Sequence, residues 1–243
     1  MVILAVGLAA GGLLGVFGGG GAAFATPVLA LVGVPGLAAV ACPLPALLPA
    51  SFLGARGQMR TGNLDRRVAL LAMAGGLPGS LLGGLASSQV SGRTLVLLSG
   101  VLLLGVGVRV ALPDPSGHAD RCADRLQRTP LIVTLAFGVG LLAGLLANGG
   151  GFLLVPTFIV LLGLSASVAS GTSMVAGAVL SIPTLLVHWS LGHIDWRISL
   201  VFAVGVLPGT YAGTWLARRI PTDVARRAFG VLLVVFAVAF LAK

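Results

Sequence analysis

The chain has 243 residues, of which 57% are hydrophobic and 9% charged, and its mean hydropathy is +1.10. A soluble protein carries about 25% charged residues, and no soluble fold of this size can bury so much apolar surface. The net charge of +9 comes mostly from arginines at a few hydrophilic joints, which favours membrane orientation and anionic headgroups over nucleic acid. We therefore expect an all-α polytopic membrane protein that has lipids as partners and binds no nucleic acid.

The first apolar region is interrupted by glycine and proline. Small residues recur at every fourth position of 2–17, which is typical of closely packed membrane helices. The glycine run 18–21 should end this helix, because glycine exposes the backbone and is a poor helix former. A shorter apolar piece follows at 22–34. The next segment, 37–53, contains three prolines and is expected to be kinked or partly unwound.

Charged joints separate the remaining segments. In chain order they are a basic joint at 56–67, apolar spans at 68–85 and 94–108, a polar stretch at 109–128, an interrupted apolar region at 131–164, spans at 166–187 and 198–217, a basic joint at 218–227 and a last span beyond it. The second interruption falls at 148–151 and echoes the glycine run near the N-terminus. The pieces after both interruptions are too short to cross a membrane alone, since about 20 residues are needed.

The second half of the chain repeats the first. Pairs that lie 129 residues apart are Gly11 with Gly140, Gly15 with Gly144, and Gly19 with Asn148. With one residue more, 62–67 aligns with 192–197, and Leu77-Pro78-Gly79 aligns with Leu207-Pro208-Gly209. We divide the chain into a first membrane repeat at 1–112, a cytoplasmic linker at 113–129 and a second membrane repeat at 130–243.

The arginines predict that the two repeats have inverted topology. Four arginines lie in 56–67 and one in its copy, 188–197, whereas 87–94 has one and its copy, 218–227, has four. Because arginine prefers cytoplasmic loops, the bias swaps sides between the halves. We expect six full spans and two broken or re-entrant helical hairpins, which makes eight to ten helical membrane segments. Both termini should lie outside a plasma membrane of the bacterial type.

The two interruptions form the candidate substrate site. If the hairpins enter from opposite faces, the helices after the interruptions aim free N–H groups and positive dipole ends at one cavity near the midplane. Two such ends attract an anion without a buried arginine. The candidate substrate-binding residues are Gly18, Gly19, Gly20, Gly21, Asn148, Gly149, Gly150, Gly151 and a downstream cluster of Ser170, Gly171, Thr172 and Ser173. We expect no metal, cofactor or catalytic residue.

The repeated pattern of glycines and prolines resembles the sulfite exporter TauE/SafE family. The residues that carry the resemblance are Gly11, Gly15, the run 18–21 and Pro27, their copies Gly140, Gly144, the run 148–151 and Pro156, and the motifs 170–173, 192–195 and 208–213. The resemblance covers nearly the whole chain. It implies a secondary transporter, not an enzyme, for sulfite, sulfonates or other sulfur-containing organic anions. Cys42-Pro43 stands where the second half has Gly171-Thr172, so the first half lacks the hydroxyl pair.

Other interpretations stay open. The glycine stripes can serve helix packing alone, and hydroxyl groups in spans often bond to the carbonyl four residues earlier. His188 and His193 are expected in an outer interfacial loop, where they can accept protons; proton coupling and a homodimer are both left open. A passive anion channel is the main alternative to alternating access. An intramembrane protease with Ser170 or Ser173 and a histidine is disfavoured, because the chain has no GxSxG motif.

Overall fold

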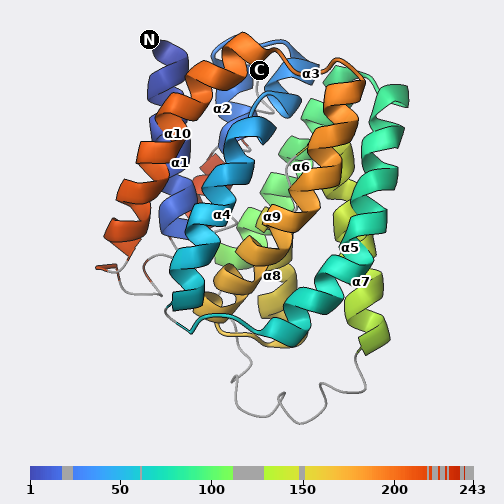
Figure 1. The fold of residues 1–243 in the computed structure, drawn as a ribbon, viewed down its shortest axis with the longest axis vertical. Coiled ribbons are helices and arrows are strands. Elements are labelled where there is room, and N and C mark those ends of the chain that lie inside the picture. The colour runs from blue at the N-terminus through green and yellow to red at the C-terminus, as the bar shows by residue number, and fades with distance from the viewer. Residues whose placement is uncertain are drawn as a thin grey trace.

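A computed structural model of the chain is entirely helical in its regular secondary structure over the part that it describes. That part comprises residues 1–17, 24–60, 62–111, 129–147, 151–217, 219–220, 224, 228, 230–235 and 238. The helices are α1 (Val2–Phe17), α2 (Ala25–Leu31), α3 (Gly36–Ala41), α4 (Leu44–Arg60), α5 (Arg66–Ala86), α6 (Gly92–Ala111), α7 (Thr129–Leu145), α8 (Gly151–Leu162), α9 (Ala166–Ser190) and α10 (Trp196–Ala217), with a short 3₁₀ turn, η2 (Ser87–Gln89). Figure 1 shows them as one bundle.

Four helical regions of the described chain are long and apolar enough to cross a bilayer. They are Leu37–Met59, Arg66–Gln89, Ser167–Ser190 and Trp196–Ala217. The first of these is interrupted at Cys42 and Pro43, between α3 and α4, as the prolines predict. The helices that follow the two interruptions are the return arms of the expected hairpins. They are α2, with 7 residues, and α8, with 12, and both are too short to cross a membrane, which confirms the expectation for them. The last expected span lies largely outside the described residues.

Glycine stripes lock α1 against α10. A Cβ added at any of three glycines of α1 would collide with the backbone of α10, and the three are Gly7, Gly11 and Gly15. The same holds in reverse for three glycines of α10, which are Gly205, Gly209 and Gly213. Backbones can approach this closely because the residue at each contact point on one helix has no side chain. The predicted packing role of these stripes is therefore confirmed.

The pair α5 and α7 repeats this packing. Three glycines of α5 meet the α7 backbone without room for a Cβ, and they are Gly75, Gly79 and Gly83. In return, Gly140 and Gly144 of α7 meet the backbone of Gly76 and Ser80. Under the sequence shift, α7 corresponds to α1 and α5 corresponds to α10. Each close pair thus joins one helix of the first half to one of the second.

Corresponding helices run in opposite directions. The contacts of α1 advance along α10 from Phe202 at Gly7 to Thr210 at Gly15, so these two helices are parallel. Figure 1 shows α1, α4 and α10 running downwards in the view, whereas α5, α7 and α9 run upwards. Under the shift, α4 corresponds to α9. Every one of these three corresponding pairs is therefore opposed in direction.

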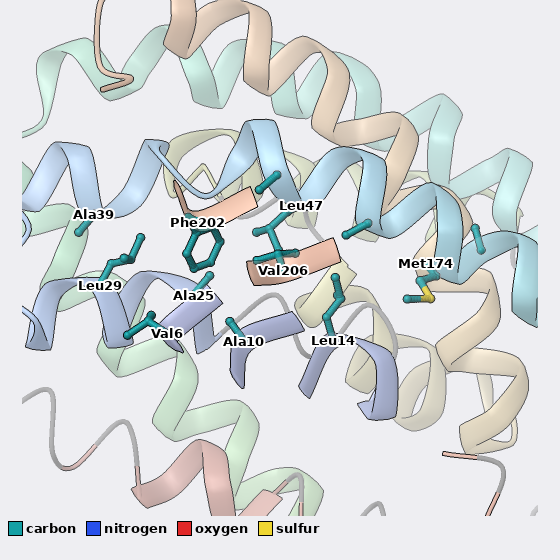
Figure 2. Close-up of a cluster of buried hydrophobic side chains, with 13 residues drawn as sticks. Val6, Ala10, Leu14, Ala25, Leu29, Ala39, Leu47, Met174, Phe202 and Val206 are labelled. Carbon is teal, nitrogen blue, oxygen red and sulfur yellow. The ribbon is translucent and has the colours of Figure 1, made fainter. Parts of the chain in front are cut away.

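The two largest hydrophobic clusters of the described residues pack different groups of helices. The first, drawn in Figure 2, packs α1, α2, α3, α4 and α10 around Leu14, Leu29 and Phe202. The second packs α5, α7, α8 and α9 around Phe158, Leu154 and other buried residues. Met174 of α9 belongs to the first core, and its side chain lies against Gly54 of α4. The crossing of α4 and α9 therefore links the two groups of helices.

The same turn joins α4 to α5 and α9 to α10. Gly62 and Gly192 adopt φ of +75° and +70°, a left-handed conformation that suits glycine after a helix end. Three residues later, the Asp65 carboxylate accepts a hydrogen bond from the Val68 N–H at 3.1 Å, and Asp195 accepts one from Ile198 at 3.3 Å. An aspartate at this position stabilises the start of a helix. The repeated Gly and Asp thus specify two tight helical turns.

Candidate functional site

The structure describes the residues that flank the two interruptions and the cluster downstream of the second one. Seven of the predicted residues lie outside the described part of the chain, and they are Gly18, Gly19, Gly20, Gly21, Asn148, Gly149 and Gly150. Five are described, namely Gly151, Ser170, Gly171, Thr172 and Ser173. The position of the site is therefore given by the residues on either side of each interruption.

The segments that follow the two interruptions meet. Phe24, which precedes α2, and Leu153, in the first turn of α8, lie in one buried cluster with Leu233. Phe17 and Leu142, from the arms that precede the interruptions, pack against the same cluster. The structure therefore brings together the flanks of two interruptions that are far apart in the sequence. Repeated motifs can suggest such a pairing, but only the fold supplies it.

The first arms of the two hairpins are α1 and α7, the helices that precede the interruptions. Their ends reach overlapping levels along the axis of α9. The Ser170 hydroxyl, five residues into α9, donates to the carbonyl of Phe17 at the end of α1, at 3.4 Å. The Nε2 atom of His188, in the last turn of α9, lies 3.0 Å from the carbonyl oxygen of Gly144 near the end of α7. Each first arm thus extends beyond the middle of α9. The meeting of the two tips near the midplane stays a prediction, because the tips lie outside the described residues.

Ser170 differs from the other members of its cluster. The buried Thr172 hydroxyl accepts the Asp65 N–H at 3.0 Å, and the Ser173 hydroxyl donates to the Ser170 carbonyl at 2.9 Å. A Cβ at Gly171 would collide with the Asn63 carbonyl. Thr172 and Gly171 thus hold α9 against the turn before α5, whereas Ser173 bonds within α9. Ser170 is half-buried and points to the end of α1, so it is the member of the cluster that faces the first hairpin.

Most other hydroxyl groups in the spans bond to their own helix, as predicted. Thr157, Ser181 and Thr184 donate to the carbonyl four residues earlier, at 2.7, 2.7 and 3.0 Å. Such groups are already satisfied within the helix and have less to offer a ligand. Ser170 differs from these three groups, because its hydroxyl donates to a carbonyl of another hairpin.

Cys42 is the counterpart of Thr172. Its sulfur accepts the Asp195 N–H at 3.3 Å, as the Thr172 hydroxyl accepts the Asp65 N–H. The contact shifts the alignment by one residue from the sequence interpretation, in which Cys42 stood opposite Gly171. Both halves therefore place a polar acceptor at this turn, a thiol in one and a hydroxyl in the other. The role of Thr172 is accordingly explained by the turn.

The start of α8 supplies backbone donors to the site. Gly151 is buried and begins the helix directly after the second interruption. The first N–H groups of an α-helix have no partner within it and carry the positive end of its dipole. Leu153, in the same turn, reaches the cluster shared with Phe24. The first turn of α8 therefore lies where the two hairpins converge, with donors suited to an anion.

Comparison with known proteins identifies the family. The family described as sulfite exporter TauE/SafE matches residues 3–240. The chain belongs to this family. A probable membrane transporter protein of Xylella fastidiosa strain 9a5c is 29% identical to this TauE/SafE member, over 97% of the chain and 94% of the relative. The probable membrane transporter protein YdhB of Bacillus subtilis is 24% identical, over 94% of each chain. No solved structure matches the chain.

Family membership and the apolar helices together establish a multi-pass membrane protein. The geometry of this TauE/SafE chain does not support the protease interpretation. Ser173 and His188 lie on one helix, 15 residues or about 22 Å apart along its axis. Ser170 lies further still from the histidine. A serine nucleophile and its base must lie within hydrogen-bonding distance.

His188 is the residue that the sequence interpretation misplaced. The expectation of an interfacial loop is wrong for it, because the side chain is fully buried in the last turn of α9. Its Nδ1 atom lies 3.1 Å from Nδ1 of His193, which is partly exposed in the following turn. The repeat contained a signal for this position, because a shift of 130 residues aligns the two histidines with Gln58 and Asn63.

Proposed function

We propose that this TauE/SafE protein is a secondary transporter that moves a small sulfur-containing anion, such as sulfite or a sulfonate, across the bacterial plasma membrane by alternating access. The observation that carries the proposal is the convergence of the two hairpins, in which Phe24 and Leu153 share one cluster. The family description supports the substrate class, and the names of the relatives support transport. No catalytic activity is indicated by either.

Two inverted repeats give the transporter equivalent structures on the two sides of the membrane. The opposed directions of the three corresponding helix pairs support two repeats, 1–112 and 130–243, related by an axis in the membrane plane. With the linker 113–129 on the cytoplasmic side, six spans and two hairpins follow, and both termini lie outside. The Arg219 guanidinium stacks over Trp215 at 4.0 Å at one end of the bundle, and Trp189 and Trp196 form an exposed pair at the other. These residues suit the two membrane interfaces.

The anion binds where the return arms start. Its donors are the free N–H groups at the start of α8, the Ser170 hydroxyl and the glycine-rich backbone of both interruptions. The proposed site comprises 18–21, 148–151 and Ser170, with Gly171 and Thr172 holding α9 in place and Ser173 bonded to the Ser170 carbonyl. Backbone donors of this kind bind an anion without a buried cation. The second half contributes more than the first, because Val40 takes the place of Ser170 under the shift of 130 residues.

Two helix groups rock against each other during transport. One group is α1–α4 with α10, and the other is α7–α9 with α5, each with its own core. Backbone contacts at glycines make the pairs α1–α10 and α5–α7 rigid. One contact between the groups is the crossing of α4 and α9, where the flexible Met174 side chain fills the space at Gly54. That crossing is the proposed pivot.

Ligand-dependent thermal stability tests the binding site. A ligand that binds only the folded protein raises its melting temperature as RT ln(1 + [L]/Kd). Sulfite, methanesulfonate, acetate and chloride are compared on the purified protein. We expect stabilisation by the sulfur-containing anions and its loss in Asn148→Leu. Equal stabilisation of the wild type and a well-folded Asn148→Leu variant would remove the site from the interruptions.

A further inference from the structure

A pair of histidines connects the outer end of the protein to the second hairpin. His188 is fully buried, and its Nε2 atom lies 3.0 Å from the carbonyl oxygen of Gly144. Its Nδ1 atom lies 3.1 Å from Nδ1 of His193. Gly144 is near the C-terminal end of α7, four residues before Asn148 and the second interruption. A chain of two hydrogen bonds thus runs from the turn after α9 to the arm that leads into the proposed anion site.

The other half of the protein makes the same contact with groups that do not titrate. The Asn63 side-chain amide donates to the Gln58 side-chain oxygen at 3.2 Å. The backbone is the same too, since Asn63 N–H bonds to the Gln58 carbonyl at 3.2 Å and His193 N–H bonds to the His188 carbonyl at 3.1 Å. The fold of the turn therefore does not require histidine. Two imidazoles at one end, and two amides at the other, make the two ends differ in their response to pH.

The geometry determines where the protons lie when the pair is neutral. A carbonyl oxygen only accepts, so His188 Nε2 carries a hydrogen and donates to Gly144. The Nδ1 atom of His188 is then an acceptor, and His193 must donate to it from Nδ1. The Nε2 atom of His193 is left as the basic position. The direction of donation, from the turn to the helix, is the one found for Asn63 and Gln58.

One added proton can pass along the pair without breaking either bond. A proton that binds Nε2 of His193 makes that ring a cation, which still donates from Nδ1. Transfer of the Nδ1 proton to Nδ1 of His188 then leaves His193 neutral and moves the charge to His188. The buried cation would lie near the C-terminal ends of α7 and α9, whose dipoles favour positive charge. It would also lie next to the hairpin arm that holds the second interruption.

No acidic side chain neutralises the pair from a neighbouring element among the described residues. Asp195 directs its carboxylate to the N–H groups of Arg197 and Ile198 at the start of α10, at 2.9 and 3.3 Å. From α3, Cys42 bonds to the Asp195 backbone. Near the end of α5, Gly84 lies against the apolar side chain of Val187 in α9. Partial burial of the ring lowers the pKa of His193 below its ordinary value, so the pair is neutral at neutral pH and takes up its proton only on acidification.

We propose that His188 and His193 form a proton-binding site that couples outside protons to anion binding at the second interruption. The inference rests on the proposed transport of an anion. Proton and anion bind cooperatively, because the charge on His188 lies beside the arm that presents the anion donors. By linkage, each then raises the affinity for the other by the same factor.

The test uses proteoliposomes and a double variant that copies the amide pair. His188→Gln with His193→Asn preserves the hydrogen bonds of the Gln58 and Asn63 turn, so it is expected to fold. Methanesulfonate is the probe, because its charge does not change in the range studied. Wild-type uptake should fall about tenfold for each pH unit once the outer pH exceeds the titration of the pair, the slope for one required proton. The double variant should take up the probe with no such slope, whereas His118→Asn should keep the wild-type slope.

Each result has a separate meaning. A pH slope that is unchanged in the double variant, or absent from the wild type, overturns the proton site while leaving transport standing. No uptake of the probe by the wild type at any pH counts against the proposed function. In that case, ¹⁵N-histidine NMR of the purified protein still decides the inference. The signals of His188 and His193 should shift together with shared apparent pKa values, as coupled groups do, and independent titration of the two rings would refute the proposal.

Discussion

The two halves of the protein share their backbone contacts and differ in their polar side chains. The glycine contacts of α1 with α10 are repeated by α7 with α5, and the turn at Gly62 is repeated at Gly192. Some polar contacts are repeated with different groups, since Thr172 and His188 keep the contacts of Cys42 and Gln58, whereas Val40 offers no counterpart to the Ser170 hydroxyl. Groups required for the fold are therefore found in both halves. Groups found in one half are the better candidates for function.

The largest expected effect is a loss of thermal stability when a packing glycine is replaced in either half. Gly11→Ala and Gly140→Ala should both lower the melting temperature in detergent, because each new Cβ would collide with backbone atoms of the facing helix. Overpacking of this kind costs about 1–3 kcal/mol or more. The controls are Gly12→Ala and Gly138→Ala, where a Cβ meets nothing within 4 Å. Tolerance of the change in one half alone would break the equivalence of the two helix pairs.

The next effect should be confined to the second half. Ser170→Ala should reduce methanesulfonate uptake about tenfold or more, because a hydrogen bond to a charged group contributes about 1.5–3 kcal/mol. Ser181→Ala is the matched control on the same helix, since its hydroxyl already donates to the Gly177 carbonyl at 2.7 Å. Initial uptake rates at equal protein content provide the measurement. Equal rates for the two variants would leave Ser170 as a packing residue.

Cys42 tests whether the thiol and the hydroxyl are equivalent. Cys42→Val should lower the free energy of unfolding by about 0.5–1.5 kcal/mol, because the Asp195 N–H loses its acceptor in the protein. Cys42→Thr copies the second half and should leave stability close to that of the wild type. Thermal melts of both variants check the pair. A Thr variant as unstable as the Val variant would show that Cys42 and Thr172 do not occupy equivalent environments.

The smallest expected effect is the pH dependence of stability at the turn between α9 and α10. The pKa of His193 is lowered in the folded protein by partial burial, so the folded state binds fewer protons there than the unfolded chain. This contribution to stability is complete above the ordinary histidine pKa of about 6.5 and is lost as the pH falls through the folded value. The wild type should therefore lose melting temperature on acidification slightly more than the double variant His188→Gln with His193→Asn. A reversed difference would mean that the folded turn favours the charged ring.

Much of the fold followed from the sequence, because repeated glycines, prolines and aspartates have strict backbone roles. The short return arms and the glycine packing follow from poor helix propensity and small size. The partners of the helices did not follow, since periodicity does not say that α1 packs on α10 and not on its neighbour in sequence. The burial of His188 was missed because its position near a charged joint suggested a loop. Its contact with Gly144 depends on how far α7 extends along α9.

Counterflow tests the central claim of alternating access most directly. Proteoliposomes loaded with unlabelled methanesulfonate are diluted into a trace of labelled methanesulfonate. Because one site is exposed to each side in turn, the labelled anion should accumulate transiently above its equilibrium level inside, with a rate that saturates. Passive current that neither saturates nor drives accumulation would contradict the account and favour an anion channel.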